Sequence, residues 1–148
     1  MSKMEEADQI IMKHVIWSLG AGLIPLPLFD ITAVTAIQVD MLTQLGNLFG
    51  TDITKSAGKT LVSALAGSTA AKLGASVFKA LPGIGTIIGG VSMSVMSGAS
   101  TYAVGQVAIS YLEENGELIG IDMKWAKKAY DEAFEKGKKS GIRFTRQN

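Results

Sequence analysis

The sequence predicts an all-α fold, built from two helical hairpins that each turn at a proline corner and from an amphipathic C-terminal helix. Prolines occur only in two short segments, Leu23–Pro27 and Leu81–Gly85, and proline breaks the interior of a helix. The segments between these corners contain few bounded β-rich runs. Charge is also uneven: Ala80–Leu112 carries no charged side chain, whereas the chain from Glu113 onward carries many.

The length of 148 residues suits one domain. We expect a single helical domain over 1–148, with a hydrophobic two-hairpin body at 8–114, a charged C-terminal helix at 115–140 and a frayed tail at 141–148. Five helices are predicted within it, at about 4–23, 30–49, 54–80, 84–114 and 122–140. The residues expected to form the corners are Pro25, Pro27, Pro82 and Gly83.

The second predicted helix has the clearest local signals. Asp30 can act as its N-cap, because a carboxylate accepts hydrogen bonds from the free amides of the first turn. Gly50 is placed to end the helix, and Asp52 or Thr54 to begin the next. An apolar stripe runs along the helix at helical spacing and consists of Ile31, Val34, Ile37, Met41, Leu45 and Leu48.

Small residues line the third and fourth predicted helices at positions where helices could pack closely. A glycine inside a helix costs roughly 0.5–1 kcal/mol relative to alanine, so close packing must compensate for it. Two interpretations are open: tight packing inside a soluble bundle, or close helix contacts in or on a membrane. The residues expected at these helix-packing or oligomer interfaces are Ala66, Ala70, Gly74, Gly85, Gly89, Ser94, Gly98 and Gly105.

The fifth predicted helix is polar with a narrow apolar stripe. Asp122 can cap it, and Trp125, Ala129 and Phe134 form the stripe. We expect this helix to dock on the hydrophobic body. Its lysines also permit an alternative role as an anchor on anionic headgroups, although acidic residues in the same helix weaken that idea.

Composition excludes several classes of function. The formal net charge is +1, which gives little reason to expect nucleic-acid binding. Without cysteine there is no disulfide, thiolate nucleophile or cysteine metal site. No small-residue cleavage site follows a compact apolar core near the start, so we predict no signal peptide and a chain that begins in the cytoplasm.

No motif predicts catalysis or a cofactor. Gly58–Thr60 matches only the end of a phosphate-binding loop, because Ile53 stands where that motif needs glycine. The glycines around Gly85 do not have the spacing of a dinucleotide site. His14 is the only histidine and has no cluster of metal ligands around it in the sequence, so we expect it on a helix face near the polar boundary. We therefore predict a protein that is not an enzyme, with no catalytic residue, no cofactor and no metal site.

Asp30 and Asp40 are the acidic residues of the first apolar half, and a carboxylate at membrane depth is a functional hypothesis by default. Asp40 has three candidate surroundings: a polar cleft, a lysine such as Lys59 or Lys72, or a pore. Both aspartates are therefore candidates for a polar or ion path.

The two corners also carry a family resemblance. Ala21–Gln38, with the run AGLIPLPLFD followed by ITAVTAIQ, and Leu81–Gly90 with Ala99–Gly105 resemble the paired signatures of an uncharacterised bacterial family. That domain of unknown function is found alone, in YcjF-like inner-membrane proteins and behind Era-like or dynamin-like GTPase domains. The resemblance covers about residues 8–140. It implies an α-helical, membrane-associated module without known catalytic residues, and a GTPase would have to be a separate partner.

We therefore expect a non-enzymatic, membrane-associated helical protein that self-assembles through its glycine-, alanine- and serine-rich faces. A bilayer span needs about 20 mostly apolar residues, and only the segment 84–114 is comfortably long enough. The expected location is the bacterial cytoplasmic (inner) membrane with both termini in the cytoplasm, and the expected partners are lipid and further copies of the chain. Two alternatives remain: a soluble homo-oligomer or adaptor for a GTPase partner, located in the cytoplasm, and an oligomeric channel or pore.

Overall fold

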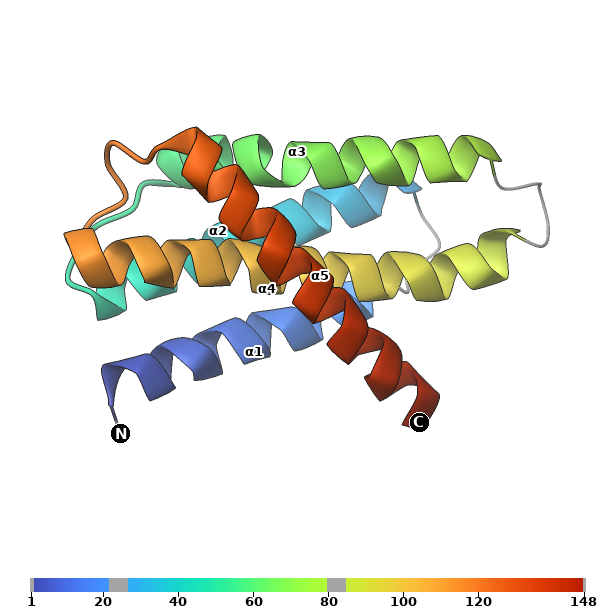
Figure 1. Cartoon of the computed structure of the whole chain (residues 1–148), viewed down its shortest axis with the longest axis horizontal. Helices are drawn as coiled ribbons and strands as arrows, with labels where there is room; N and C mark the ends of the chain where they lie inside the picture. Colours follow the sequence, from blue (N-terminus) through green and yellow to red (C-terminus); the bar gives the residue numbers. More distant parts are fainter. Residues whose placement is uncertain (1, 22–26, 80–84, 148) are drawn as a thin grey trace.

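The computed structural model confirms the all-α fold (Figure 1). It describes the backbone of residues 2–21, 27–79 and 85–147, and the side-chain environments of 2–20, 33–67 and 94–140. Within these residues there are helices and no strands. The helices are α1 (Lys3–Ala21), α2 (Pro27–Leu48), α3 (Lys55–Lys79), α4 (Gly85–Asn115) and α5 (Met123–Gln147).

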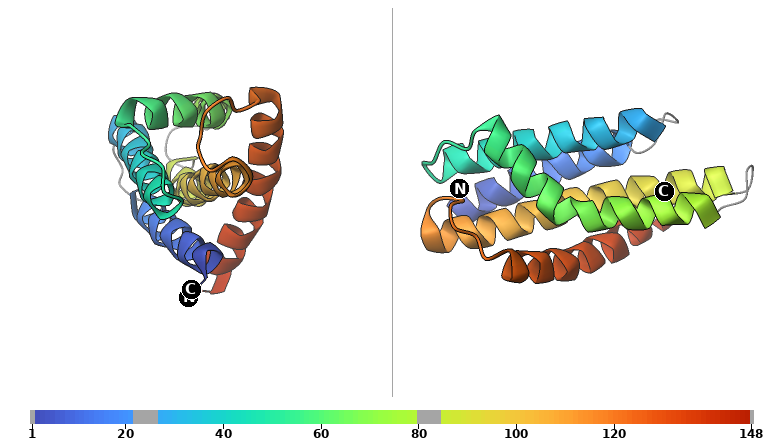
Figure 2. Two further views of the ribbon diagram at one scale, coloured as in Figure 1. Left: turned by 90° about the vertical axis from the view of Figure 1, so that its left-hand side faces the viewer. Right: turned by 90° about the horizontal axis from the view of Figure 1, so that it is seen from above.

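Helix α4 is the central element of the bundle. It packs against α1, α2, α3 and α5, and the end-on view of Figure 2 shows the other helices arranged around it. From Ser94 to Ile109 every residue of this helix is buried or partly buried, and Val95 and Val104 are among the core residues. A helix that is apolar all around belongs in a core or a membrane. The other helices of the same chain therefore surround the described part of α4.

The sequence predicted several of the helix ends correctly. Gly50 follows α2 with a φ of 79°, and Gly116 follows α4 with a φ of 76°, the left-handed conformation that glycine adopts at helix C-termini. The Thr54 side-chain oxygen accepts from the Ala57 amide at 3.1 Å at the start of α3. Asp122 Oδ1 accepts from the Lys124 amide at 3.0 Å before α5. These side chains satisfy amides that the first turn of each helix leaves free.

Two helix ends differ from the prediction. Helix α2 begins at Pro27, so Asp30 lies inside the first turn and is not the N-cap. Proline is well suited to the first helical position, because its missing N–H has no partner there in any case. Helix α5 continues to Gln147, beyond the predicted end at residue 140. The corner residues Pro25, Pro82 and Gly83 lie outside the described residues.

The two hairpins lie side by side, and the helix ends that flank residues 22–26 and 80–84 lie at the same end of the bundle (Figure 1). Helices α1 and α3 run toward this end, and α2 and α4 run away from it. We call it the corner end. The α2–α3 and α4–α5 connections lie at the opposite end.

The expectation that the fourth helix spans a bilayer is not supported. Among the described residues, no helix has both the length and the mean hydropathy that a membrane crossing requires. The long uncharged stretch of α4 is rich in glycine, serine and threonine, which lower its hydropathy.

Candidate functional site

The predicted small-residue face of α4 packs against α1 of the same chain. A Cβ atom added at Gly98 would lie 2.7 Å from Leu19 Cδ2, and one added at Gly105 would lie 2.8 Å from Ile11 Cγ1. Ser94 on the same helix donates a hydrogen bond of 2.7 Å to the Leu19 carbonyl oxygen. These small residues therefore form a groove into which α1 inserts its side chains.

The other predicted packing residues are distributed more widely. Ala66 on α3 is partly buried against the core. The structure also shows a close crossing that was not predicted, where a Cβ atom at Gly137 of α5 would lie 3.1 Å from Ala99 Cα of α4. Four of the predicted residues, Ala70, Gly74, Gly85 and Gly89, lie in helices but outside the described side chains.

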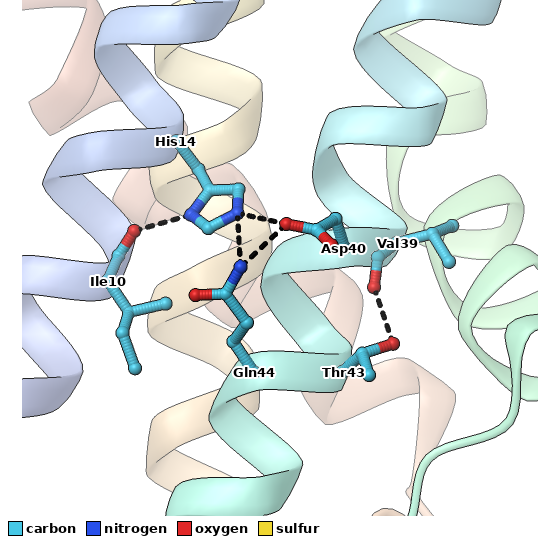
Figure 3. A network of polar contacts seen from close by, with 6 residues as sticks. All are labelled: Ile10, His14, Val39, Asp40, Thr43 and Gln44. Atoms are coloured by element: carbon cyan, nitrogen blue, oxygen red, sulfur yellow. Dashed lines mark hydrogen bonds and ion pairs between the residues drawn. The ribbon is translucent and has the colours of Figure 1, made fainter.

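A polar cluster joins α1 to α2 and contains the chain's only histidine (Figure 3). His14 is fully buried, whereas the sequence predicted it near the polar boundary. Its Nε2 lies 2.8 Å from Asp40 Oδ2, and its Nδ1 lies 2.6 Å from the Ile10 carbonyl oxygen. Gln44 Nε2 donates to the same Asp40 oxygen at 2.7 Å.

Both ring nitrogens of His14 have partners in this cluster, and each faces an oxygen atom. The Nε2 atom of His14 also lies 3.5 Å from Gln44 Nε2. The Asp40 side chain is 54% exposed, so its carboxylate lies at the surface end of the cluster. Asp40 has His14 and Gln44 as hydrogen-bond partners, and the three surroundings considered for Asp40 stay predictions.

A second polar network lies in the core and links four helices. The hydroxyls of Ser18 on α1 and Thr101 on α4 share a hydrogen bond of 2.6 Å. Gln38 Nε2 of α2 donates to Ser100 Oγ and Thr101 Oγ1, each at 3.1 Å. Ser100 in turn shares a hydrogen bond of 2.8 Å with the Tyr130 hydroxyl of α5. Gln38 Oε1 is buried and has no hydrogen-bond partner.

Sequence reasoning missed this network, although it contained a usable signal. Gln38 stands three, four and seven residues before Met41, Leu42 and Leu45, which are all fully buried. This spacing places Gln38 on the core face of α2, and a buried amide needs polar partners. The predicted stripe instead used Ile37, which is only partly buried.

The predictions on metal binding and on an ion path can be compared with the described residues. No group of three histidine, cysteine or acidic side chains that could hold a metal ion occurs in the part of the chain that the structure describes. The Asp30 side chain lies outside the described residues, so an ion path through Asp30 and Asp40 stays a prediction. The polar groups that the structure brings together connect helices to one another.

Comparison with known proteins gives two matches. A family model described as "Domain of unknown function (DUF697)" matches residues 2–138. The chain is also similar to the "Magnetosome membrane protein 22" of Magnetospirillum gryphiswaldense, with 34% identity over 137 residues that cover 89% of this chain and 70% of the relative. No solved structure matches the chain.

Proposed function

The chain belongs to the family of the domain of unknown function DUF697, and on this basis we propose that it is a non-enzymatic, membrane-associated helical module that self-assembles. Its place would be the bacterial cytoplasmic (inner) membrane, with the cytoplasm as the alternative. The observation that carries the proposal is the similarity to a magnetosome membrane protein over 89% of the chain. The long uncharged stretch Ala80–Leu112 and the apolar sequence around both corners support it.

Self-assembly is supported by small residues on α3 that are exposed and are not needed for helix packing within one chain. Gly67 on α3 is exposed, and a Cβ atom added there would meet no atom within 4 Å. Ser63 lies one turn earlier on the same helix and is also exposed. This spacing lets the backbones of two helices approach closely. In contrast, Gly98 and Gly105 contact α1 of their own chain.

Cell fractionation tests the membrane part of the proposal. Membranes from cells that make the untagged protein are washed with carbonate and with high salt, and the extract is analysed by chromatography with light scattering. We expect the protein to stay with the membrane until detergent is added, and to run in detergent as a defined oligomer. Recovery of the whole protein in the soluble fraction would contradict membrane association.

Gly67→Leu is expected to abolish or weaken self-assembly while leaving the helical fold intact. A leucine side chain at this position has free space within the monomer, but it would separate two α3 helices that pack through Gly67. The measurement is the molar mass in detergent by light scattering, together with the helical circular dichroism signal. Ser110→Leu is the control, since Ser110 is exposed on α4, outside α1 and α3. An unchanged molar mass for Gly67→Leu would exclude α3 as the assembly face.

The remaining functions considered from the sequence, an adaptor for a GTPase partner and an oligomeric channel, stay predictions. No contact among the described residues favours either of them over a membrane-associated module.

A further inference from the structure

The exposed side of α1 changes character along the helix. In its first half, the exposed residues include Lys3, Glu5, Glu6 and Asp8. In its second half they are Met12, Lys13, Ile16, Trp17 and Gly20. Met12 is 50% exposed, Ile16 62% and Trp17 47%, although a large apolar side chain is normally placed in the core. The apolar half is the half that runs toward the corner end (Figure 1).

Met12, Lys13, Ile16 and Trp17 form one surface, here called the α1 outer patch. They lie within about one and a half turns, and the residues between them, His14 and Val15, face the other helices. Ile11 on the inner side contacts Gly105 of α4. Helix α1 is thus fixed from within, and its outer patch has no partner among the described residues.

The chemistry of the patch fits the boundary between lipid headgroups and acyl chains. The ammonium group of Lys13 lies 4.8 Å from the Trp17 ring centre, so a cation sits directly beside the apolar surface. Lysine can extend its charge to headgroups while its methylene chain stays in apolar surroundings, and tryptophan is enriched at this depth. The edge contact of Trp17 with the His14 ring, with centres 5.0 Å apart, fixes the indole in place.

The charge around the patch also favours an anionic surface. From Gln9 to the end of α1, the exposed residues include Lys13 and no acidic residue. Among the hydrogen-bond partners of the neighbouring His14, the acidic one is Asp40, whose Oδ2 is bonded by both His14 and Gln44. The patch therefore presents one positive charge, and the neighbouring carboxylate of Asp40, which is 54% exposed, is hydrogen-bonded to His14 and Gln44.

Uncharged stretches of the sequence near the patch also support its contact with a bilayer. Val15–Phe29 contains no charged residue, and neither does the stretch from Ala80 into the first half of α4. The helix ends that flank both stretches lie at the corner end. At this end α1 runs into uncharged sequence, α3 ends at Lys79 and α2 carries Asp30 in its first turn.

We propose that the α1 outer patch is the bilayer-contacting surface, and that it binds at the headgroup boundary of a membrane that contains anionic lipid. This inference rests on the proposed membrane association and specifies its surface. The competing occupant is a second copy of this chain, paired through the same patch. The experiments below distinguish a bilayer from a second copy at this patch, and they also test the membrane association itself.

Tryptophan fluorescence tests where the membrane lies. The chain has two tryptophans, Trp17 in the patch and Trp125 at the start of α5. Trp125 packs on Tyr111 of α4. Gly98 of the same helix contacts α1 side chains near Trp17. Tyr111 lies about 20 Å further along α4 than Gly98, so the two tryptophans are far apart. In Trp125→Phe, vesicles of equal parts phosphatidylglycerol and phosphatidylcholine are expected to shift Trp17 emission to the blue, and spin-labelled lipid is expected to quench it. In Trp17→Phe, Trp125 is expected to show neither effect.

A charge placed in the patch tests its contribution to binding. Ile16→Glu is expected to lower partitioning onto these vesicles at least about tenfold in a flotation assay, because it removes an inserted side chain and adds a negative charge. Ile119→Glu is the matched control, since Ile119 is also isoleucine and 70% exposed but lies beyond α4, and its binding is expected to stay unchanged. Circular dichroism checks that both variants are folded.

Three results would overturn the inference, and they are distinguishable. Wild-type protein that does not float with vesicles would refute the proposed membrane association and this surface together. Wild-type protein that floats while Trp17 stays unquenched, or while Ile16→Glu binds normally, would refute only the surface. Ile16→Glu that floats normally but converts a dimer into a monomer would assign the patch to a second copy of the chain.

Discussion

Gly105→Leu is expected to lower the free energy of unfolding by about 3 kcal/mol. A Cβ atom at this position would lie 2.8, 3.0 and 3.2 Å from three side-chain atoms of Ile11. Ile11 is buried and β-branched, so it has few other rotamers to adopt, and α1 would have to move away from α4. The loss corresponds to a decrease of roughly 10 °C in Tm for a domain of this length.

Thermal unfolding followed by circular dichroism measures this effect. Ser110→Leu is the control, because Ser110 is exposed on the same helix and a leucine there is expected to leave Tm unchanged or to raise it. Gly98→Leu is expected to lie between the two, since its nearest neighbour is the terminal Cδ2 of Leu19. A Tm for Gly105→Leu equal to that of the wild type would mean that α1 and α4 do not approach as closely as described.

Gln38→Ala is expected to lower the free energy of unfolding by about 2–4 kcal/mol. The substitution leaves a cavity where α1, α2 and α4 meet and removes the hydrogen bonds to Ser100 and Thr101. Gln38→Met is expected to stay within about 1 kcal/mol of the wild type, since methionine fills the same space. It also removes Oε1, the buried acceptor without a partner, while Ser100 and Thr101 keep Tyr130 and Ser18 as partners.

Chemical denaturation of both Gln38 variants, with the wild type beside them, measures the two differences. The comparison separates the space that Gln38 fills from the hydrogen bonds that it makes. If Gln38→Met were as destabilised as Gln38→Ala, the amide hydrogen bonds would be the main contribution of this side chain. If Gln38→Ala were as stable as the wild type, Gln38 would not be packed in the core.

Much of the fold could be predicted because its signals are local. The prolines delimit the hairpins, and Gly50, Thr54 and Asp122 act where the sequence places them at helix ends. The exception at Asp30 has a local cause too, because Pro27 is itself a good first helical residue and starts α2 earlier.

The partners of the small residues could not be predicted, because glycine permits close approach of any second helix. Ser94 and Gly98 have the small-xxx-small spacing of a membrane interface, yet their partner is α1 of the same chain. Helical periodicity gives the side of α4 on which they lie but does not say which helix covers that side. The polar networks of His14 and Gln38 were hidden for the same reason, since their partners come from different helices.

The central place of α4 has a consequence for how the chain is made. Ile11 can pack against Gly105 only after Gly105 has been synthesised. At a synthesis rate of about 5–20 residues per second, the ribosome needs about 5–20 s to extend the chain from Ile11 to Gly105. During this interval the inner face of α1 lacks its main covering, and a chaperone or a nearby lipid surface can bind it first. Folding also has to join the beginning of the chain to a helix near its end, so we expect it to be slower than in bundles whose neighbouring helices pack in sequence order. Completion of the core is therefore a late event in the synthesis of this protein.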